Sequence, residues 1–314
     1  MYPLSSISTI PLKIEVFGEC PIAINRPVAF ISSVLLSRLL LILTPSTTVS
    51  PNTSSISEVS LGKTVITKKQ INESGYEDVR SVLESIVGLD VYSDGPRGQK
   101  TSVFMRGTNS NHTLVLLNGI PINDQSSPKA MFDFGYDFLQ GLQQIEIYKG
   151  ASGAIFGPAA IGGAINFVTD IDYNNSYSIS GFNTNNNSFN YNQTKITKNG
   201  WHLNFKGAAN QMKTDSAIAK GSEKDGTQNY QFNLNSNKWI NENLKFKSTF
   251  YGRDTNSDYD KNATTEENVT SDNKMYALQL GLEKFTNNSF DNFIIHYHNY
   301  DREYDEQGTV NKYY

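Results

Sequence analysis

The sequence has one cysteine, few charged side chains and no long hydrophobic run among its 314 residues. Cys20 alone can form neither a disulfide framework nor a cysteine-ligated metal cluster within the chain. Charged residues make up 18% of the sequence, below the roughly 25% of an average soluble protein. The formal net charge of -4 argues against nucleic acid as the main partner, because phosphate binding requires a strongly basic face.

The N-terminal segment, residues 1–55, differs from the rest of the chain in composition. Its one strongly apolar run, residues 28–43, contains Arg38 and is shorter than the ~20 residues that a spanning helix needs. Lys13 and Arg26 precede this run, as in an export signal, but no Ala-x-Ala cleavage site follows it. Two interpretations remain open here, a leader sequence and a start codon assigned too far upstream.

Residues 56–170 predict a small α+β domain. A strand is expected over residues 64–66, followed by a helix that ends at Gly88 and whose apolar stripe is Val79, Val82, Leu83 and Ile86. Residues 113–117 form an apolar run before Asn118-Gly119, a strong turn dipeptide. The segment "LQQIEIYKG" alternates like a half-buried strand. The domain therefore has a modest core of its own.

Residues 171–314 predict antiparallel strands of ~9 to 11 residues with alternating character. In "WHLNFKGAA", for example, Trp201, Leu203 and Phe205 alternate with polar residues. Short links separate some strands, and long polar loops over residues 211–226 and 254–273 separate others. A soluble sandwich and a membrane barrel both show this alternation. The strand length, the aromatic residues near strand ends and the unequal turns favour a transmembrane β-barrel whose polar face lines the lumen.

One block of the sequence resembles a known family. The ordered segments "VGLDV", "FMRGTNSNHTLVLLNG", "IEIYKG" and "FGPAAIGGAIN" resemble the plug domain of TonB-dependent outer-membrane receptors, and most nearly the vitamin B12 (cobalamin) receptor branch. The resemblance covers residues 64–169. It implies a plug inside a barrel of about 22 strands, of which this chain holds about seven. The fold expected is thus a plug domain followed by an incomplete barrel, in the N-terminal portion of a receptor.

The resemblance implies a function in import rather than in catalysis. A scarce ligand, cobalamin first and an iron–siderophore chelate second, would enter through the outer membrane of a Gram-negative bacterium. The TonB–ExbB–ExbD complex would supply the energy, no cofactor would be required, and the protein would not be an enzyme. No clear TonB box precedes Thr64; "SISEVSLG" stands in its place. The rival interpretation is a passive adhesin or structural surface protein with a plug-like domain.

The resemblance also implies roles for individual residues. Two apical loops match the ligand-contacting loops of the family, and the alternative for each of their residues is a solvated loop position. These candidates are Arg97, Gln99, Asp124, Gln125, Ser126 and Ser127. The structural plug motif matches Arg106, Gly107, Asn118, Gly119, Glu146, Lys149, Gly150, Gly157, Gly162 and Gly163. Arg106 is expected to anchor the plug by an ion pair or hydrogen bonds. Lys149 replaces the family's arginine, so a point charge replaces a bidentate contact.

Calcium is a further possibility that the resemblance raises. Acidic residues of the early extracellular loops would bind it, since oxygen ligands suit a hard cation; solvated acidic loops are the alternative. The candidates are Asp215, Glu223, Asp225, Asp258 and Asp260. His296 and His298 fall on one face of a strand. There we expect lumen-facing histidines rather than a metal-binding pair.

Overall fold

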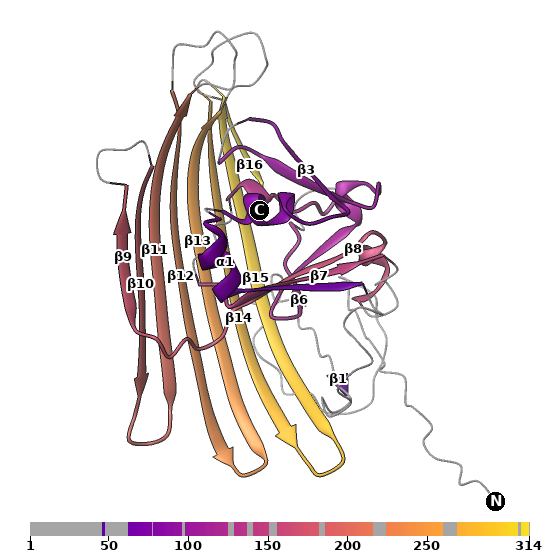
Figure 1. Ribbon diagram of the computed structural model, residues 1–314, viewed down its shortest axis with the longest axis vertical. Coiled ribbons are helices and arrows are strands. Elements are labelled where there is room, and N and C mark those ends of the chain that lie inside the picture. The colour runs from indigo at the N-terminus through magenta and orange to yellow at the C-terminus, as the bar shows by residue number, and fades with distance from the viewer. Residues whose placement is uncertain are drawn as a thin grey trace, which may run out of the picture.

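The computed structural model describes residues 46–47, 62–76, 78–95, 98–124, 129–136, 141–150, 156–181, 186–215, 224–259, 269–306 and 309–313. These residues form two parts (Figure 1). An N-terminal domain, residues 62–168, lies against one face of a sheet of nine strands, which we call the large sheet. Within the described ranges, no helix has the length and apolar character needed to cross a membrane.

The N-terminal domain contains a five-stranded sheet, a strand pair and short helices. The order in the five-stranded sheet is β2–β7–β8–β5–β6, and only the β5–β8 pair is parallel. Its strands are β2 (Lys63–Thr67), β5 (Thr113–Leu117), β6 (Ile120–Pro121), β7 (Gln144–Lys149) and β8 (Gly163–Val168). The remaining elements are α1 (Lys68–Ser74), α2 (Val79–Glu84), the paired strands β3 (Leu89–Ser93) and β4 (Thr101–Met105), and the 3-10 turns η2 (Ser110–His112), η3 (Phe134–Tyr136) and η4 (Pro158–Ala160).

Side-chain caps define where both α-helices begin. Thr67 forms a capping box with Gln70 at the start of α1, and Asp78 forms one with Ser81 at the start of α2. Helix α1 was not predicted, because only Ile71 of its residues is buried and no apolar stripe marks it. Helix α2 ends at Glu84 rather than at Gly88, so that part of the prediction is wrong.

The end of α2 is set by its backbone rather than by a glycine cap. The N–H of Ser85 bonds to carbonyls within the last turn, to Val82 and Leu83, which tightens the helix and stops it. Gly88 has φ of +86° in the turn that leads into β3. Ile86 still packs against the core from this turn. An apolar stripe therefore marks buried positions correctly and overstates the length of the helix.

The main apolar core of the N-terminal domain extends to the large sheet, and a smaller second cluster contains Leu114, Leu116, Ala160 and Ala164. All five residues of β5 are buried, as expected for residues 113–117. Val79, Leu83, Ile145 and Ile165 are among the buried residues of this core. The same cluster includes four residues of the large sheet, Tyr251, Met275, Ala277 and Tyr300. The two parts are thus joined by apolar as well as polar contacts.

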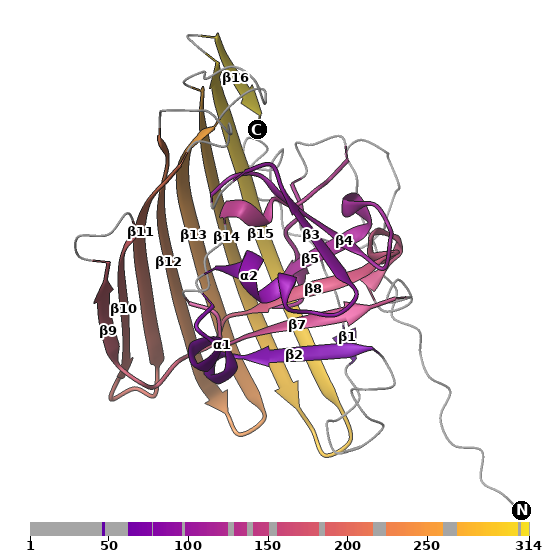
Figure 2. The same ribbon diagram turned by 45° about the horizontal axis from the view of Figure 1, so that its top comes forward.

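The large sheet is an antiparallel meander in which each strand from β9 onward pairs with the next. Its strands are β9 (Ser176–Ser180), β10 (Asn186–Ile196), β11 (His202–Asp215), β12 (Lys224–Asn241), β13 (Leu244–Tyr259), β14 (Val269–Phe285), β15 (Phe290–Glu306) and β16 (Thr309–Tyr313), with β1 (Ser46–Thr47) paired to the start of β15. Figure 2 shows β2, β7 and β8 running across the direction of the long strands.

The long strands exceed the predicted length. Strands β11 to β15 have 14 to 18 residues, not the ~9 to 11 expected for a minimal span. The stretches 211–226 and 254–273, predicted as loops, in part continue the ladder, for example through the pairs Lys213–Gly226 and Ser257–Ser271. The backbone supplies the ladder bonds regardless of side-chain polarity, so polar residues do not mark where a strand ends.

The two faces of the large sheet differ in the way that the alternation predicts. Polar side chains such as Asn204, Asn229 and Thr255 are fully buried on the face toward the N-terminal domain. Apolar side chains are exposed on the opposite face, among them Phe205, Leu234, Phe250, Leu278 and Phe293. A soluble sandwich would place its apolar side chains between two sheets, so this arrangement rules out that alternative for the described strands.

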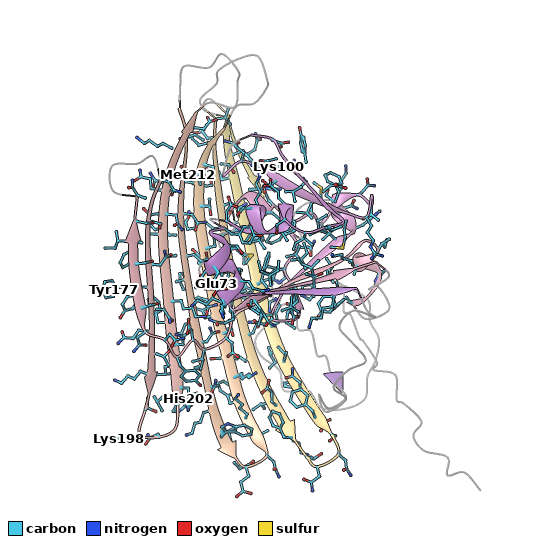
Figure 3. The ribbon with its side chains drawn as sticks, in the orientation of Figure 1. Glu73, Lys100, Tyr177, Lys198, His202 and Met212 are labelled. Atoms are coloured by element: carbon cyan, nitrogen blue, oxygen red, sulfur yellow. The ribbon has the colours of Figure 1, made fainter. Side chains whose placement is uncertain are left out.

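Aromatic rings gather at the end of the large sheet where the turns are short. Trp201 contacts Phe246 there, and Phe285 contacts both Trp239 and Phe290. Figure 3 marks this end by Lys198 and His202. We call it the short-turn end and the opposite end the long-loop end. Rings at such positions are typical of a membrane–water interface.

Candidate functional site: the contact between the N-terminal domain and the large sheet

Gln99 attaches the loop between β3 and β4 to the large sheet near its long-loop end. Its Nε2 donates to the backbone oxygen of Asp258 at 2.5 Å, and the side chain is buried. Next to it, Gly98 has φ of +86°, and a Cβ there would lie 1.9 Å from the Oγ1 of Thr227. Only glycine fits this close approach. The predicted candidate Gln99 therefore contacts the protein itself in this structure.

Asp124 makes an ion pair with the large sheet. Its Oδ2 lies 3.3 Å from Nη1 of Arg302 on β15, and the Asp124 side chain is almost fully buried. The guanidinium of Arg302 also lies over the ring of Tyr304, 5.4 Å from its centroid. Removing one partner of a buried ion pair leaves the other charge uncompensated. The pair consequently fixes the segment after β6 to β15.

Asp133 is a second acidic side chain at this level, and sequence reasoning missed it. Its Oδ1 accepts hydrogen bonds from the backbone N–H groups of Thr101 and Gly135, each at 2.9 Å. Burial raises the pKa of Asp133 to about 6, although these bonds and the positive charges of Arg253 and Lys100 act in the opposite direction. The carboxyl therefore gains its charge near mildly acidic pH. The sequence around Asp133, "MFDFGYDF", contains no motif that could have identified this residue.

Arg253 brings a fully buried cation to the same region from β13. Its Nη2 donates to Oδ1 of Asn273 at 2.7 Å and to the hydroxyl of Tyr300 at 2.8 Å. The guanidinium also lies 5.7 Å from the centroid of the Tyr300 ring. In the sequence, the one signal for this residue is that an arginine stands on the polar side of an alternating strand. Together, Arg253, Arg302 and the two aspartates form a charged upper contact, with Lys100 beside it (Figure 3).

The turn Asn118-Gly119 forms a second contact, closer to the short-turn end. Asn118 has φ of +51°, a conformation that asparagine tolerates better than most residues. Its Nδ2 donates to Oγ1 of Thr169 at 3.0 Å and to Oε1 of Gln279 at 3.2 Å. Gln279 returns a bond from Nε2 to the backbone oxygen of Leu117 at 2.7 Å. The turn dipeptide thus attaches β5 to β14.

The segment that leaves the N-terminal domain is held to the large sheet by Lys206. Its buried Nζ donates to the backbone oxygens of Gly141 at 3.0 Å and Asp170 at 2.7 Å. Asp172 forms an ion pair with Lys68 at the start of α1. Burial alone would raise the pKa of Asp172, but the bond and charge of Lys68 and the Asn174 N–H lower it below the usual value. We call residues 170–172 the exit segment.

Glu146 is the centre of a polar cluster inside the N-terminal domain. Its carboxylate accepts bonds from Lys63 at 3.1 Å, Gln144 at 2.8 Å, Tyr148 at 2.9 Å and Asn166 at 2.9 Å. Burial alone would raise its pKa, but the bonds from Asn166, Lys63 and Tyr148 hold the pKa below the usual value. The cluster borders a cavity of about 340 Å³ between β7, β8 and the large sheet.

The other residues of the predicted structural motif lie at turns and close approaches. Arg106, itself exposed with φ of +50°, places its guanidinium over Gly150, where a Cβ would lie 2.7 Å from Nη1. Within the described residues its side chain has no hydrogen bond or ion pair, so the anchoring role stays a prediction. Lys149 donates from Nζ to the backbone oxygen of Val87 at 2.9 Å. The glycines lie in the turn after β4 (Gly107), after Asn118 (Gly119), before η4 (Gly157) and at the start of β8 (Gly162 and Gly163).

Several candidates lie outside the described residues, namely Arg97, Gln125, Ser126, Ser127, Glu223 and Asp260. For Asp215 only the backbone is described. Asp225 is buried on β12, and the carboxylate of Asp258 accepts the N–H of Gly226 at 3.2 Å. In the part of the chain that the structure describes, no three His, Cys, Asp or Glu side chains converge on one point. Calcium binding therefore stays a prediction that depends on the undescribed carboxylates.

The comparison with protein families decides what the N-terminal domain is. The family model named TonB-dependent Receptor Plug Domain matches residues 55–164. This segment is a TonB-dependent receptor plug domain. The vitamin B12 transporter BtuB of Vibrio vulnificus (strain CMCP6) is 37% identical over 114 residues, which are 36% of this chain and 18% of that protein. BtuB of Photobacterium profundum is 38% identical over 105 residues, 33% of this chain and 17% of its own length.

Solved structures extend the likeness from the plug to the large sheet. The ferric yersiniabactin uptake receptor FyuA from Yersinia pestis superposes with a TM-score of 0.61 at 17% identity, over 78% of this chain and 41% of that one. A G324V mutant of the ferric enterobactin receptor PfeA from Pseudomonas aeruginosa gives 0.66 at 12% identity, over 85% and 46%. The expected fold, a plug domain followed by antiparallel strands of an incomplete barrel, is confirmed.

The comparisons also define what is shared and what is not. Sequence similarity to the BtuB proteins spans less than a fifth of their length, and the structural matches span less than half of the receptors. The named relatives are a transporter and receptors rather than enzymes. At the level of the family, the expected location in the outer membrane of a Gram-negative cell is confirmed.

Proposed function

We propose that this chain acts in the TonB-dependent import of a scarce small ligand across the outer membrane. Cobalamin is the first candidate, because the curated relatives are vitamin B12 transporters. An iron–siderophore chelate is the second, because the structural neighbours include a ferric yersiniabactin uptake receptor and a protein named as a siderophore receptor, PirA from Acinetobacter baumannii. The partners would be the TonB–ExbB–ExbD complex and membrane lipid. The observation that carries the proposal is a plug domain held by polar contacts against the polar face of a sheet whose other face is apolar.

The character of the contact supports a domain that can move. Hydrogen bonds such as those of Gln99, Asn118 and Lys206 contribute little net stability when water replaces the partner, about 0.5–1.5 kcal/mol each. Among the described residues, the large sheet contributes four residues to the buried apolar core, Tyr251, Met275, Ala277 and Tyr300. Displacing the plug therefore exchanges mainly polar contacts for water, which a modest input of work can accomplish.

The upper contact is the proposed place where the ligand acts. Gln99 and Asp124 are themselves predicted to contact the ligand. In the sequence they lie beside the other candidates of the same two loops, Arg97 and Gln125 to Ser127. Gln99 and Asp124 already bond to the large sheet. A ligand that binds these loops from the long-loop end would compete with those bonds. In this way, occupancy of the loops would loosen the plug on the side away from the exit segment.

Uptake of radiolabelled ligand tests the function directly. Cells would carry the gene in its natural sequence context, a deletion of it, or the double variant Arg97→Ala and Gln99→Ala, each with and without a functional TonB. We expect deletion and loss of TonB each to abolish uptake of cobalamin, and the double variant to reduce it at least about tenfold. Glu242→Gln, on an exposed short turn, is the matched control and should import normally.

Each alternative has a distinct result in this experiment. Loss of ferric siderophore uptake with normal cobalamin uptake would assign the second ligand. Normal uptake of both ligands after deletion would refute the proposed function. Uptake that is lost on deletion but does not depend on TonB would refute the energised mechanism alone.

A further inference from the structure

His296 and His298 form a pair of contacting imidazoles on β15. Both project toward the N-terminal domain, because residues two apart on a strand share a face. Nε2 of His296 lies 2.9 Å from Nδ1 of His298, and the ring planes are tilted by 38°. His296 has no exposed surface, and His298 is half-buried. The spacing in the sequence places both rings on one face, but only the structure shows that their nitrogens converge.

Within the part of the chain that the structure describes, the one hydrogen bond of the pair is the bond between its two rings. Among the described residues, Nδ1 of His296 has no hydrogen-bond partner. Gln279 stands opposite His296 on β14, but its amide is already bonded to Leu117 and Asn118 of the plug. Ala277 stands opposite His298 and fills little volume. The two imidazoles are therefore one another's main polar contact, and Nδ1 of His296 lacks the partner that a buried polar atom normally has.

The distance between the two nitrogens suits a shared metal ion. Imidazole nitrogens bind transition metals at about 2.0–2.1 Å, and two such bonds at a right angle place the nitrogens roughly 2.9 Å apart. A tetrahedral angle would require roughly 3.3 Å. Square-planar and tetragonal sites with nitrogen ligands favour Cu(II) and Ni(II). The second torsion of histidine is soft, so both rings can turn their lone pairs toward one ion.

We infer that His296 and His298 form a two-histidine site for a divalent transition metal, Cu(II) or Ni(II), at the contact between the plug and the large sheet. The remaining coordination positions would be taken by water or by donors of a ligand that carries the ion. Both histidines bind in the neutral form, so the ring that donates the present hydrogen bond moves its N–H proton to its other ring nitrogen when the ion enters, with no net loss of a proton. This site uses nitrogen donors and is distinct from the predicted calcium site, which uses carboxylates near the long-loop end.

Titration of the purified, detergent-folded chain with Cu(II) tests the site. Cys20→Ser in every variant removes the one thiol of the chain. The chain has four histidines, so His112→Gln and His202→Gln are matched controls that leave the pair intact. We expect one ion for each chain and an electron paramagnetic resonance spectrum with two equatorial imidazole nitrogens. His296→Gln and His298→Gln should each weaken binding by more than about tenfold, while the controls keep it.

The electron paramagnetic resonance spectrum is recorded on the chain with both histidines in place. This part of the test therefore does not depend on whether a variant folds. A thermal melt adds a second measurement, since an ion that binds only the folded chain raises its melting temperature. This rise should appear in both control variants and disappear in His296→Gln. A spectrum without imidazole nitrogens, binding that survives both substitutions in the pair, or binding that is lost in His112→Gln would each overturn the inference.

Discussion

The N-terminal domain and the large sheet place their apolar side chains in opposite ways. In the N-terminal domain, Ile145, Ile147 and Ile165 are completely buried. In the large sheet the buried side carries Asn204, Asn229 and Asn273, and the aromatic and aliphatic side chains face outward. Alternation along a strand therefore defines two faces without saying which of them is the inside. The medium that each face meets decides that, and here the outward face suits hydrocarbon.

The largest expected effect is in the core of the N-terminal domain. Ile145→Ala should lower the free energy of unfolding by about 2–5 kcal/mol, because it removes buried methylenes and leaves a cavity. Ile179→Ala, at a side chain that is 55% exposed on β9, should have a much smaller effect. Denaturant titration of both variants in the same lipid measures the difference. Equal losses would show that the two regions do not differ in packing.

A charge on the outward face tests which medium that face meets. Leu278→Arg, near the middle of β14, should cost about 2–4 kcal/mol in a lipid bilayer. The same substitution at Trp239, near the short-turn end, should cost only about 0–1 kcal/mol. The free energy of unfolding from vesicles gives both values. A cost that does not depend on position along the strand would argue against a membrane-facing surface.

The ion pair between Asp124 and Arg302 tests the polar contact between the two regions. Asp124→Asn should destabilise the protein by about 3 kcal/mol, at the lower end for a broken buried pair because Arg302 is partly exposed. Replacing both residues, by Asn and Met, should restore part of this loss, since no uncompensated charge remains. A double-mutant cycle measures the coupling. Additive losses would show that the two side chains do not depend on each other.

Two carboxyl groups of the N-terminal domain should respond to pH in opposite directions. The pKa of Asp133 is raised by burial to about 6, so the folded protein holds a proton there that the unfolded chain releases above about pH 4. The stability from Asp133 is full below pH 4 and is lost as the pH rises to 6. The pKa of Glu146 is lowered, so its contribution is present above about pH 4.5 and is lost as the pH falls.

The two slopes are separated by substitution. Asp133→Asn should remove the decline between pH 4 and 6, and Glu146→Gln should remove the loss below about pH 4.5. Melting temperatures across this range, with the unsubstituted chain as reference, provide the measurement. An unchanged profile in Asp133→Asn would mean that the carboxyl is not protonated in the folded state.

The parts of the structure that depend on local pattern could be predicted from the sequence. Residues 113–117 are apolar throughout and form the buried strand β5, and the alternation around Phe205 and Leu234 assigns the faces of the large sheet correctly. Helix α1 and the strand ends have no such pattern. Strand ends in particular depend on how far the backbone ladder continues, which side-chain polarity does not reveal.

The contacts of the candidate site lay beyond sequence reasoning for a different reason. Gln99 bonds to Asp258, which is 159 residues away, and Gln279 bonds to Leu117 across 162 residues. Residue type shows that such a side chain can donate or accept, but not which distant backbone it meets. Asp133 acquires its raised pKa only through burial by distant segments. The sequence therefore shows which residue types the loops carry, while the partners of these residues come from the fold.

The attachment of the exit segment to Lys206 and Asn204 determines how any tilt of the N-terminal domain is distributed. A body fastened at one end rotates about that point, and displacement grows in proportion to distance from it. Gln99 and Asp124 lie toward the opposite end, so a rotation of a few degrees moves them furthest while Asp170 scarcely shifts. The geometry would convert a small angular change near the pivot into its greatest displacement at the long-loop end of the large sheet.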